Sequence, residues 1–281
     1  MVFLFRLLGR IPLRLLHPLG ACAAWLTYVL SPTYRRHLGE NIRQAGFDDR
    51  VRRKAIGEAG KQMLEILRIW SLPLDKAIAQ VVEVRGWEYV EAAQRAGKGI
   101  LFLTPHLGCF EITAQYYSAF GDIAVLYRPP KRAFIQKMIL DGRKRDKLHL
   151  APADVSGVRA LIKALKRGQA VGMLPDQAPK EGEGAWVKFF GRYAYTMTLA
   201  ARLSETGATT LMAWGERLPG GRGYCLHFGP PRAAFAGKTL ERAQQINDEI
   251  EVLIRACPAQ YLWGYNRYKR PRGAELPPGQ G

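Results

Sequence analysis

The stretch from Gly99 to Glu111 constrains the fold of this chain more than any other. It opens with an apolar run, Ile100 to Leu103, which ends at Thr104-Pro105, and an apolar or small segment follows from Ile112 to Phe120. The run predicts a buried strand, and the later segment predicts a helix. A loop that leads from a strand into a helix is where open α/β sheets place their functional side chains.

Two ionisable side chains, His106 and Glu111, lie in this loop. Positions five apart on an ideal helix are about 140° from each other, so the two can meet only if His106 lies in a turn before the helix. Pro105 and Gly108 favour such a turn, because proline fixes φ and glycine tolerates unusual dihedrals. Glu111 can then hold one ring nitrogen of His106 while the other nitrogen takes a proton from a hydroxyl. The spacing therefore predicts a general base, His106, paired with Glu111.

Two other interpretations of His106 are open. A histidine at a strand end can be hydrogen-bonded for structural reasons alone. A zinc site of the metalloprotease type needs two histidines four apart on one helix, and no second histidine lies nearby in the sequence. We expect no metal here.

The segment from Thr104 to Glu111 resembles the His-x4-Asp/Glu motif of the glycerolipid-type acyltransferases. Its Gly108 and Glu111, two and five positions after the histidine, are similar to those of the lipid A biosynthesis late acyltransferases, the lauroyl and myristoyl transferases. Further segments fit that family in the same order, from about residue 20 to 271: Tyr127-Arg128-Pro129, Gly142 to Arg145, Leu174 to Gln177, Val187 to Gly191, and Pro258 to Trp263 followed by Arg267 to Pro271.

The resemblance implies an O-acyltransferase that moves a fatty acyl chain from acyl carrier protein, or coenzyme A, to a hydroxyl of a phosphorylated lipid A precursor. No cofactor is implied. Arg143 is the best candidate for contacting the substrate, because a guanidinium can bind two phosphate oxygens. Arg128 and Arg145 are further candidates. Asp176 follows the predicted strand Ala170 to Leu174 and can orient a side chain or a backbone amide, or be an ordinary turn residue.

Charge indicates an anionic partner. The 281 residues include 42 Lys and Arg against 24 Asp and Glu, a net charge of +18. Nucleic acid, anionic lipid and an acidic carrier protein all fit the composition, and the resemblance selects the carrier, the phosphorylated glycolipid and the membrane over nucleic acid. Four scattered cysteines predict free thiols in a reducing compartment.

Residues 1–32 form a predicted membrane-associating segment. Arg6, Arg10 and Arg14 recur every four residues, and an uncharged stretch from Leu19 to Leu30 follows Pro18. Those 12 residues make about 18 Å of helix, which is short of a bilayer core of about 30 Å. No convincing cleavage site follows the segment, which argues against a signal peptide. A spanning helix and an interfacial helix are the two alternatives that the sequence leaves undecided. The resemblance implies the inner membrane, with the catalytic domain on the cytoplasmic side.

The remaining pattern predicts one α/β catalytic domain over residues 33–271, with a mixed central sheet flanked by helices, and a disordered tail over 272–281. Predicted strands include Asp122 to Tyr127, Thr210 to Gly215 and Tyr224 to Phe228.

Two rival functions remain. One is an acyltransferase for another lipid acceptor, such as a lysophospholipid or a glycosylated phosphatidylinositol. The other is a non-catalytic basic protein that binds membrane or nucleic acid.

Overall fold

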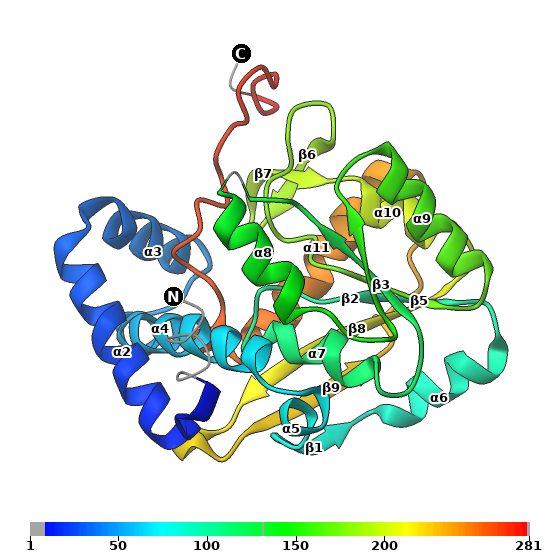
Figure 1. The fold of residues 1–281 in the computed structure, drawn as a ribbon. Coiled ribbons are helices and arrows are strands. Elements are labelled where there is room, and N and C mark those ends of the chain that lie inside the picture. Colours follow the sequence, from blue (N-terminus) through cyan, green and yellow to red (C-terminus); the bar gives the residue numbers. More distant parts are fainter. Residues whose placement is uncertain (1–8, 131, 280–281) are drawn as a thin grey trace.

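Seven strands build the central sheet of the computed structural model, which describes residues 9–130 and 132–279 (Figure 1). Their order across the sheet is β1-β9-β8-β2-β5-β3-β4, and every neighbouring pair is parallel except β8 and β9. The sheet is therefore mixed, as predicted. The strands are β1 (Val81–Arg85), β2 (Ile100–Leu103), β3 (Ile123–Tyr127), β4 (Leu148–Pro152), β5 (Ala170–Met173), β8 (Thr209–Arg217) and β9 (Tyr224–Gly229).

Strand β2 lies in the middle of the sheet and is buried on both faces. Leu101 and Leu103 pack into one apolar cluster, and Ile100 and Phe102 pack into another on the opposite face. A strand that is buried on both faces has apolar residues at every position, instead of apolar and polar residues in alternation. This explains why β2 consists of four consecutive apolar residues.

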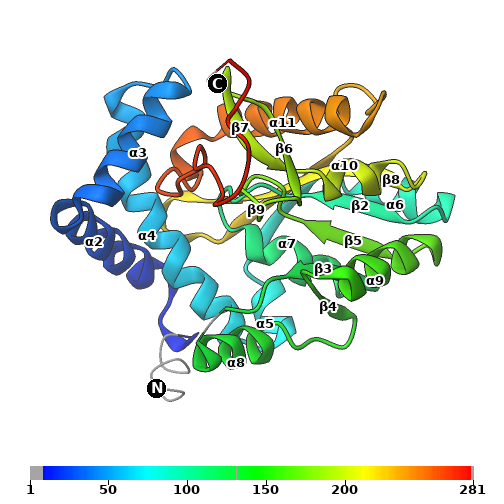
Figure 2. The same ribbon diagram turned by 90° about the horizontal axis from the view of Figure 1, so that it is seen from above.

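Helices cover both faces of the sheet (Figures 1 and 2). One face packs against α9 (Val155–Lys166), α10 (Leu199–Ser204) and α11 (Thr239–Ala256), and the other against α5 (Leu74–Ile78), α6 (Trp87–Ala96) and α7 (Phe110–Tyr117). A hairpin of β6 (Gly184–Phe189) and β7 (Arg192–Met197) lies beside α11, and its Val187, Phe189 and Phe190 are core residues.

Three helices, α2 (Leu13–Leu30), α3 (Pro32–Gln44) and α4 (Asp49–Ser71), form a flank at the edge of the molecule (Figure 2). Helix α2 packs along α4, and the two backbones touch where Gly20 meets Gly60. By length and composition, α2 is the one helix in the described residues that could cross a membrane. Helix α2 continues through Pro18, so it is longer than the uncharged stretch from Leu19 to Leu30. Arg6, which was predicted to belong to the same segment, lies outside the described residues.

Some local features differ from the sequence prediction. Helix α9 is capped by Asp154, whose carboxylate accepts from the Gly157 N–H. Strand β4, helix α8 (Ala133–Gly142) and the short 3₁₀ turns η1 (Pro219–Gly221) and η2 (Pro258–Gln260) were not anticipated. Residues 272–279 contain no helix or strand, and the Glu275 carbonyl accepts from the Trp186 indole; their predicted disorder stays a prediction.

Candidate active site

The loop between β2 and α7 carries His106 and is held by backbone hydrogen bonds to three other segments. The Thr104 N–H donates to Met173 O of β5, Gly108 N–H to Gln260 O of η2, and Cys109 N–H to Gly215 O of β8. A Cβ at Gly108 would collide with the Gly215 carbonyl oxygen, and its φ of 58° suits glycine. The predicted turn around His106 is confirmed, and its backbone is fixed from both sides.

Asp176 holds His106 by two atoms. One carboxylate oxygen lies 2.8 Å from the ring Nδ1, and the other accepts the His106 backbone N–H at 2.9 Å. Burial raises the pKa of Asp176, but the charge of His106 and these hydrogen bonds outweigh it and hold that pKa below its usual value. Asp176 therefore contacts both the side chain and the backbone amide of His106.

The predicted contact between Glu111 and the His106 ring is wrong. Among the hydrogen bonds of the described residues, none joins these two side chains. Glu111 is instead paired with Arg143 through two bonds, Nε to Oε1 at 2.8 Å and Nη2 to Oε2 at 2.6 Å. The reason is geometric: Glu111 lies in the first turn of α7 where the guanidinium of Arg143 arrives from the end of α8, and this fork satisfies both carboxylate oxygens.

The second ring nitrogen of His106, Nε2, faces the side chain of Gln177. With Nδ1 donating to Asp176, Nε2 carries the lone pair, and the Gln177 amide nitrogen lies 3.2 Å from it. The Phe110 ring packs edge-on against the imidazole, with centroids 4.8 Å apart. The His106 side chain is 15% exposed, so it remains accessible.

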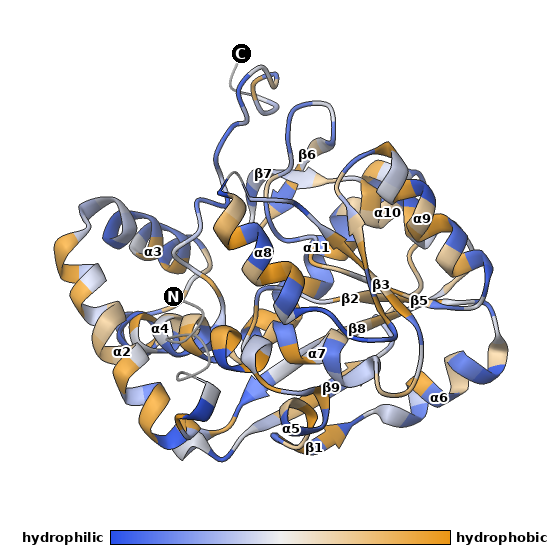
Figure 3. Cartoon of the chain, viewed as in Figure 1, coloured by the Kyte–Doolittle hydropathy of each residue, from blue (hydrophilic) through white to orange (hydrophobic). Residues whose placement is uncertain are grey.

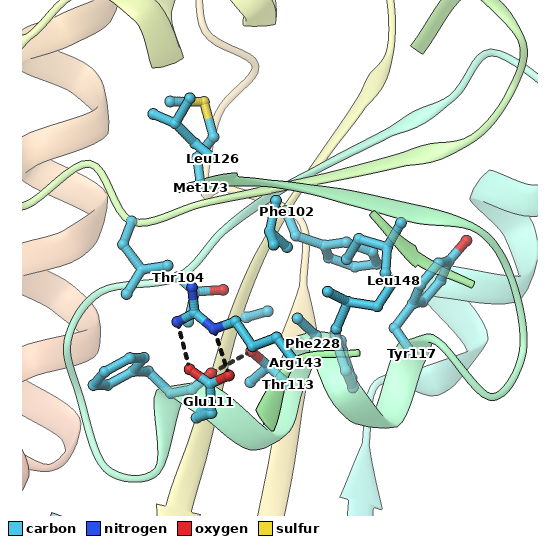
Figure 4. Close-up of a pocket in the computed structure, with 17 residues that line it drawn as sticks. Phe102, Thr104, Glu111, Thr113, Tyr117, Leu126, Arg143, Leu148, Met173 and Phe228 are labelled. Atoms are coloured by element: carbon cyan, nitrogen blue, oxygen red, sulfur yellow. Dashed lines mark hydrogen bonds and ion pairs between the residues drawn. The ribbon is translucent and has the colours of Figure 1, made fainter. Parts of the chain in front are cut away.

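A small cavity lies between α7 and the sheet, next to this loop (Figure 4). Its volume is about 50 Å³, room for a few waters. Glu111, Arg143, Thr104 and Thr113 form its polar part, and the rest is apolar or aromatic. His106 itself does not line the cavity, but Phe110, whose ring packs against the imidazole, does. The apolar lining includes Phe102, Tyr117, Ile123, Val125, Leu148 and Phe228.

Comparisons with known proteins identify the family. The model of the bacterial lipid A biosynthesis acyltransferases matches residues 1–270. The chain belongs to this family. It is similar to the lipid A biosynthesis lauroyltransferase of Escherichia coli (strain K12), with 30% identity over 226 residues, 78% of this chain and 72% of the relative.

Two further relatives from the same organism are more distant. A lipid A biosynthesis palmitoleoyltransferase is 27% identical over 219 residues, 76% of this chain and 70% of that protein. A lipid A biosynthesis myristoyltransferase is 23% identical over 202 residues, 70% of this chain and 62% of that protein. This member of the lipid A acyltransferase family is therefore an acyltransferase, and the alternative of a non-catalytic basic protein is set aside.

Other arginines predicted for the substrate of this acyltransferase occupy different surroundings. Arg128 is half-exposed and pairs with Glu183 at 3.0 Å. Arg145 is engaged by Gln115 Oε1 and by the carbonyls of Ile69 and Leu72, which ties β4 to the end of α4. Only Arg143 lines the cavity, and its guanidinium also lies 5.6 Å from the Trp70 ring centroid. Although burial lowers the pKa of Arg143, Glu111 raises it above its usual value.

A buried ion-pair cluster behind the loop was missed by sequence reasoning. Arg217 of β8 binds Glu65 and Glu58 of α4, and Gln260 bonds both the N–H and the carbonyl of Arg217. From the same helix, Gln62 donates to the Gly108 carbonyl at 2.8 Å. In the sequence, the only sign of this cluster was a set of polar residues within the apolar stripe of α4. An interpretation based on helical periodicity counts such residues as exceptions to the pattern.

Proposed function

We propose that this protein transfers a fatty acyl chain from a carrier thioester to a hydroxyl of a phosphorylated lipid A precursor, with His106 as the general base. The observation that carries the proposal is the hydrogen bond between Asp176 and Nδ1, because it places the lone pair of an accessible imidazole on Nε2, the atom that would accept a proton. Membership of the family supports the acceptor class.

The reaction follows from this tautomer. Nε2 takes the proton of the acceptor hydroxyl, and the oxygen attacks the thioester carbonyl. The tetrahedral intermediate then collapses, the C–S bond breaks, and the imidazolium returns its proton to the departing sulfur. Asp176 stabilises the imidazolium in between. No acyl-enzyme is needed.

Two kinds of donor can stabilise the negative oxygen of the intermediate. The first amides of α7 have no intrahelical acceptor and lie at the positive end of that helix. Arg143 uses Nε and Nη2 on Glu111, which leaves Nη1 for a carbonyl or phosphate oxygen. In this proposal Glu111 aims Arg143 at the site rather than orienting His106.

The apolar cavity is the starting point of an acyl pocket in this proposal. Six of its apolar or aromatic walls come from β2, β3, β4, β9 and α7, and its polar part lies at the His106 loop. Since the cavity holds only a few waters as it stands, an acyl chain would displace side chains at its wall. The half-buried Leu126 is one candidate for this movement.

We further propose that α2 attaches the protein to the inner membrane by lying in the interface, with the site on the cytoplasmic side. Its inner face packs on α4, and Figure 3 shows hydrophobic residues along α2 at the edge of the molecule. Large apolar side chains of α2 are exposed. The exposed residues are Leu15, Leu19, Trp25, Leu26, Val29 and Leu30. A helix already packed lengthwise on a charged neighbour suits an in-plane position.

The test of the reaction is an assay of purified protein with a phosphorylated lipid A precursor and acyl-carrier thioesters of several chain lengths, read by mass spectrometry. His106→Ala should lower transfer by about 10²–10⁴-fold. Acyl-coenzyme A and a lysophospholipid serve as competing donor and acceptor. Near-normal transfer by folded His106→Ala would refute the base, and preference for the lysophospholipid would refute the acceptor.

A further inference from the structure

A second group of chemically reactive side chains lies on the face of the sheet opposite the cavity. Ala213 of β8 and Phe228 of β9 line the cavity, and side chains alternate along a strand. Glu216 of β8, and Cys225 and His227 of β9, therefore point to the other face. Their donor atoms all lie within 4.8 Å of one another.

Strand pairing brings these residues together. In the antiparallel pair of β8 and β9, Glu216 is directly opposite Cys225, and Trp214 is opposite His227. Cys225 and His227 are two positions apart, so both project from the same face of β9. Strand β1 on the other side places Glu83 opposite Cys225. Cys225 thus lies in a row between two glutamates, with His227 next along its strand.

The histidine is already oriented. Its ring stacks on Trp214 with centroids 4.2 Å apart and planes 6° from parallel, and Nε2 lies 3.0 Å from Glu216 Oε2. The Cys225 thiol is buried, whereas the His227 and Glu216 side chains are partly exposed. The thiol has protein on one side, and the other donors open toward solvent, which gives an ion a way in.

We propose that Glu216, Cys225 and His227 bind a divalent transition metal ion of the zinc class. Thiolate and imidazole with one carboxylate are ligands that zinc accepts, and they argue against calcium or magnesium, which take oxygen ligands. Ligands around tetrahedral zinc are about 3.4 Å apart for bonds of about 2.1 Å, so donors that lie within 4.8 Å of one another need to close in by no more than about 1.4 Å.

Glu83 is the candidate for the fourth position. Its carboxylate is held by Arg85 at 2.7 Å, and it would have to turn from that half-exposed partner toward the ion. Four protein ligands would make the site a clamp across β1, β9 and β8. Glu216 directly follows Gly215, whose carbonyl holds the Cys109 amide of the His106 loop, so the clamp would brace the strand behind the candidate active site.

Cobalt(II) titration of the purified, chelator-treated full chain tests the site. Wild-type protein should bind one equivalent and show a thiolate-to-cobalt charge-transfer band that zinc(II) abolishes. Cys225→Ser should lose that band, and His227→Ala should weaken binding by more than the about 10–100-fold that losing a second-shell partner costs. Glu83→Gln should weaken binding if Glu83 completes the site.

Matched controls separate the site from adventitious binding. Cys22→Ser removes an exposed cysteine, and His149→Ala removes a histidine that pairs with Asp122 at 2.8 Å without a cysteine nearby. Both should bind cobalt like wild type. Zinc should raise the unfolding temperature of wild type but not of Cys225→Ser. A wild-type protein without the thiolate band, or a band that survives Cys225→Ser, would overturn the proposal.

Discussion

At the scale of single residues, the site is defined by the partner that each carboxylate holds. Asp176 is 1% exposed and has both oxygens on His106, whereas Glu111 has both oxygens on Arg143. The two carboxylates therefore have separate tasks. Asp176 holds the His106 imidazole, and Glu111 fixes a cation at the cavity wall.

Asp176→Asn should keep the fold and lose most of the activity. The amide can still accept the His106 backbone N–H, but it can no longer stabilise a charged ring. We expect transfer to fall on the order of 10³–10⁴-fold, as when a catalytic triad loses its carboxylate. Glu183→Gln, at the exposed partner of Arg128, is the control.

The same carboxylate links stability to pH. The pKa of Asp176 is lower in the folded state than in the unfolded state. Its contribution to the free energy of unfolding is therefore fully present above the unfolded pKa of about 3.9, and it is lost as the pH falls through the folded-state pKa. The acid-unfolding curve of Asp176→Asn should therefore lack this part of the wild-type pH dependence. An Asp176→Asn variant with the wild-type transfer rate and an unchanged acid-unfolding curve would show that Asp176 does not orient His106.

At the scale of elements, the packing of α2 on α4 places the apolar helix. The close approach at Gly20 and Gly60 leaves no space for a side chain, because a Cβ on Gly60 would collide with the Gly20 carbonyl oxygen. On the same helix, a Cβ on Gly57 would meet only the Ala21 Cβ, at 3.5 Å, which is an ordinary contact.

These two glycines of α4 allow a paired test. Gly60→Ala should destabilise the protein by about 1–3 kcal/mol, because the helices must move apart. Gly57→Ala should be neutral or stabilise by up to about 1 kcal/mol, since alanine favours a helix interior. Thermal unfolding followed by circular dichroism distinguishes them. Equal midpoints for the two variants would mean that α2 does not rest on α4 in this way.

At the scale of the whole molecule, the proposed membrane attachment would draw on two forces. The exposed face of α2 offers apolar area, and the net charge of +18 offers attraction to anionic lipid. The second force is screened by salt, because the Debye length falls from about 10 Å at 0.1 M to about 3 Å at 1 M. The first force is not.

Leu19→Gln with Leu26→Gln should weaken binding to anionic vesicles without changing thermal stability, since the two side chains are 56% and 60% exposed. Burying a leucine side chain is worth about 1.5–3 kcal/mol, so the pair should cost at least about tenfold in partitioning. Vesicle sedimentation at low and high salt measures the electrostatic and the apolar contributions to binding. Unchanged sedimentation of the double variant would remove α2 from the membrane contact.

Sequence alone determined the elements around the site and their chemistry. Apolar runs of four or five residues became β2, β3 and β5, and the amphipathic stretch Thr239–Ala256 became α11, because side-chain period and burial are local properties. The ordered motifs indicated the acyltransferase family before any fold was known, and the family comparison confirmed it.

Tertiary structure alone decided which side chains meet. Leu103 and Met173 are paired across the parallel strands β2 and β5, and His106 and Asp176 each lie three positions beyond them. Parallel pairing therefore brings together two residues 70 apart in the chain. The five-residue spacing of His106 and Glu111 could not reveal this, because a turn that frees His106 from the helix also aims it at the neighbouring strand end. Contacts between strands depend on sheet order, which local sequence does not encode.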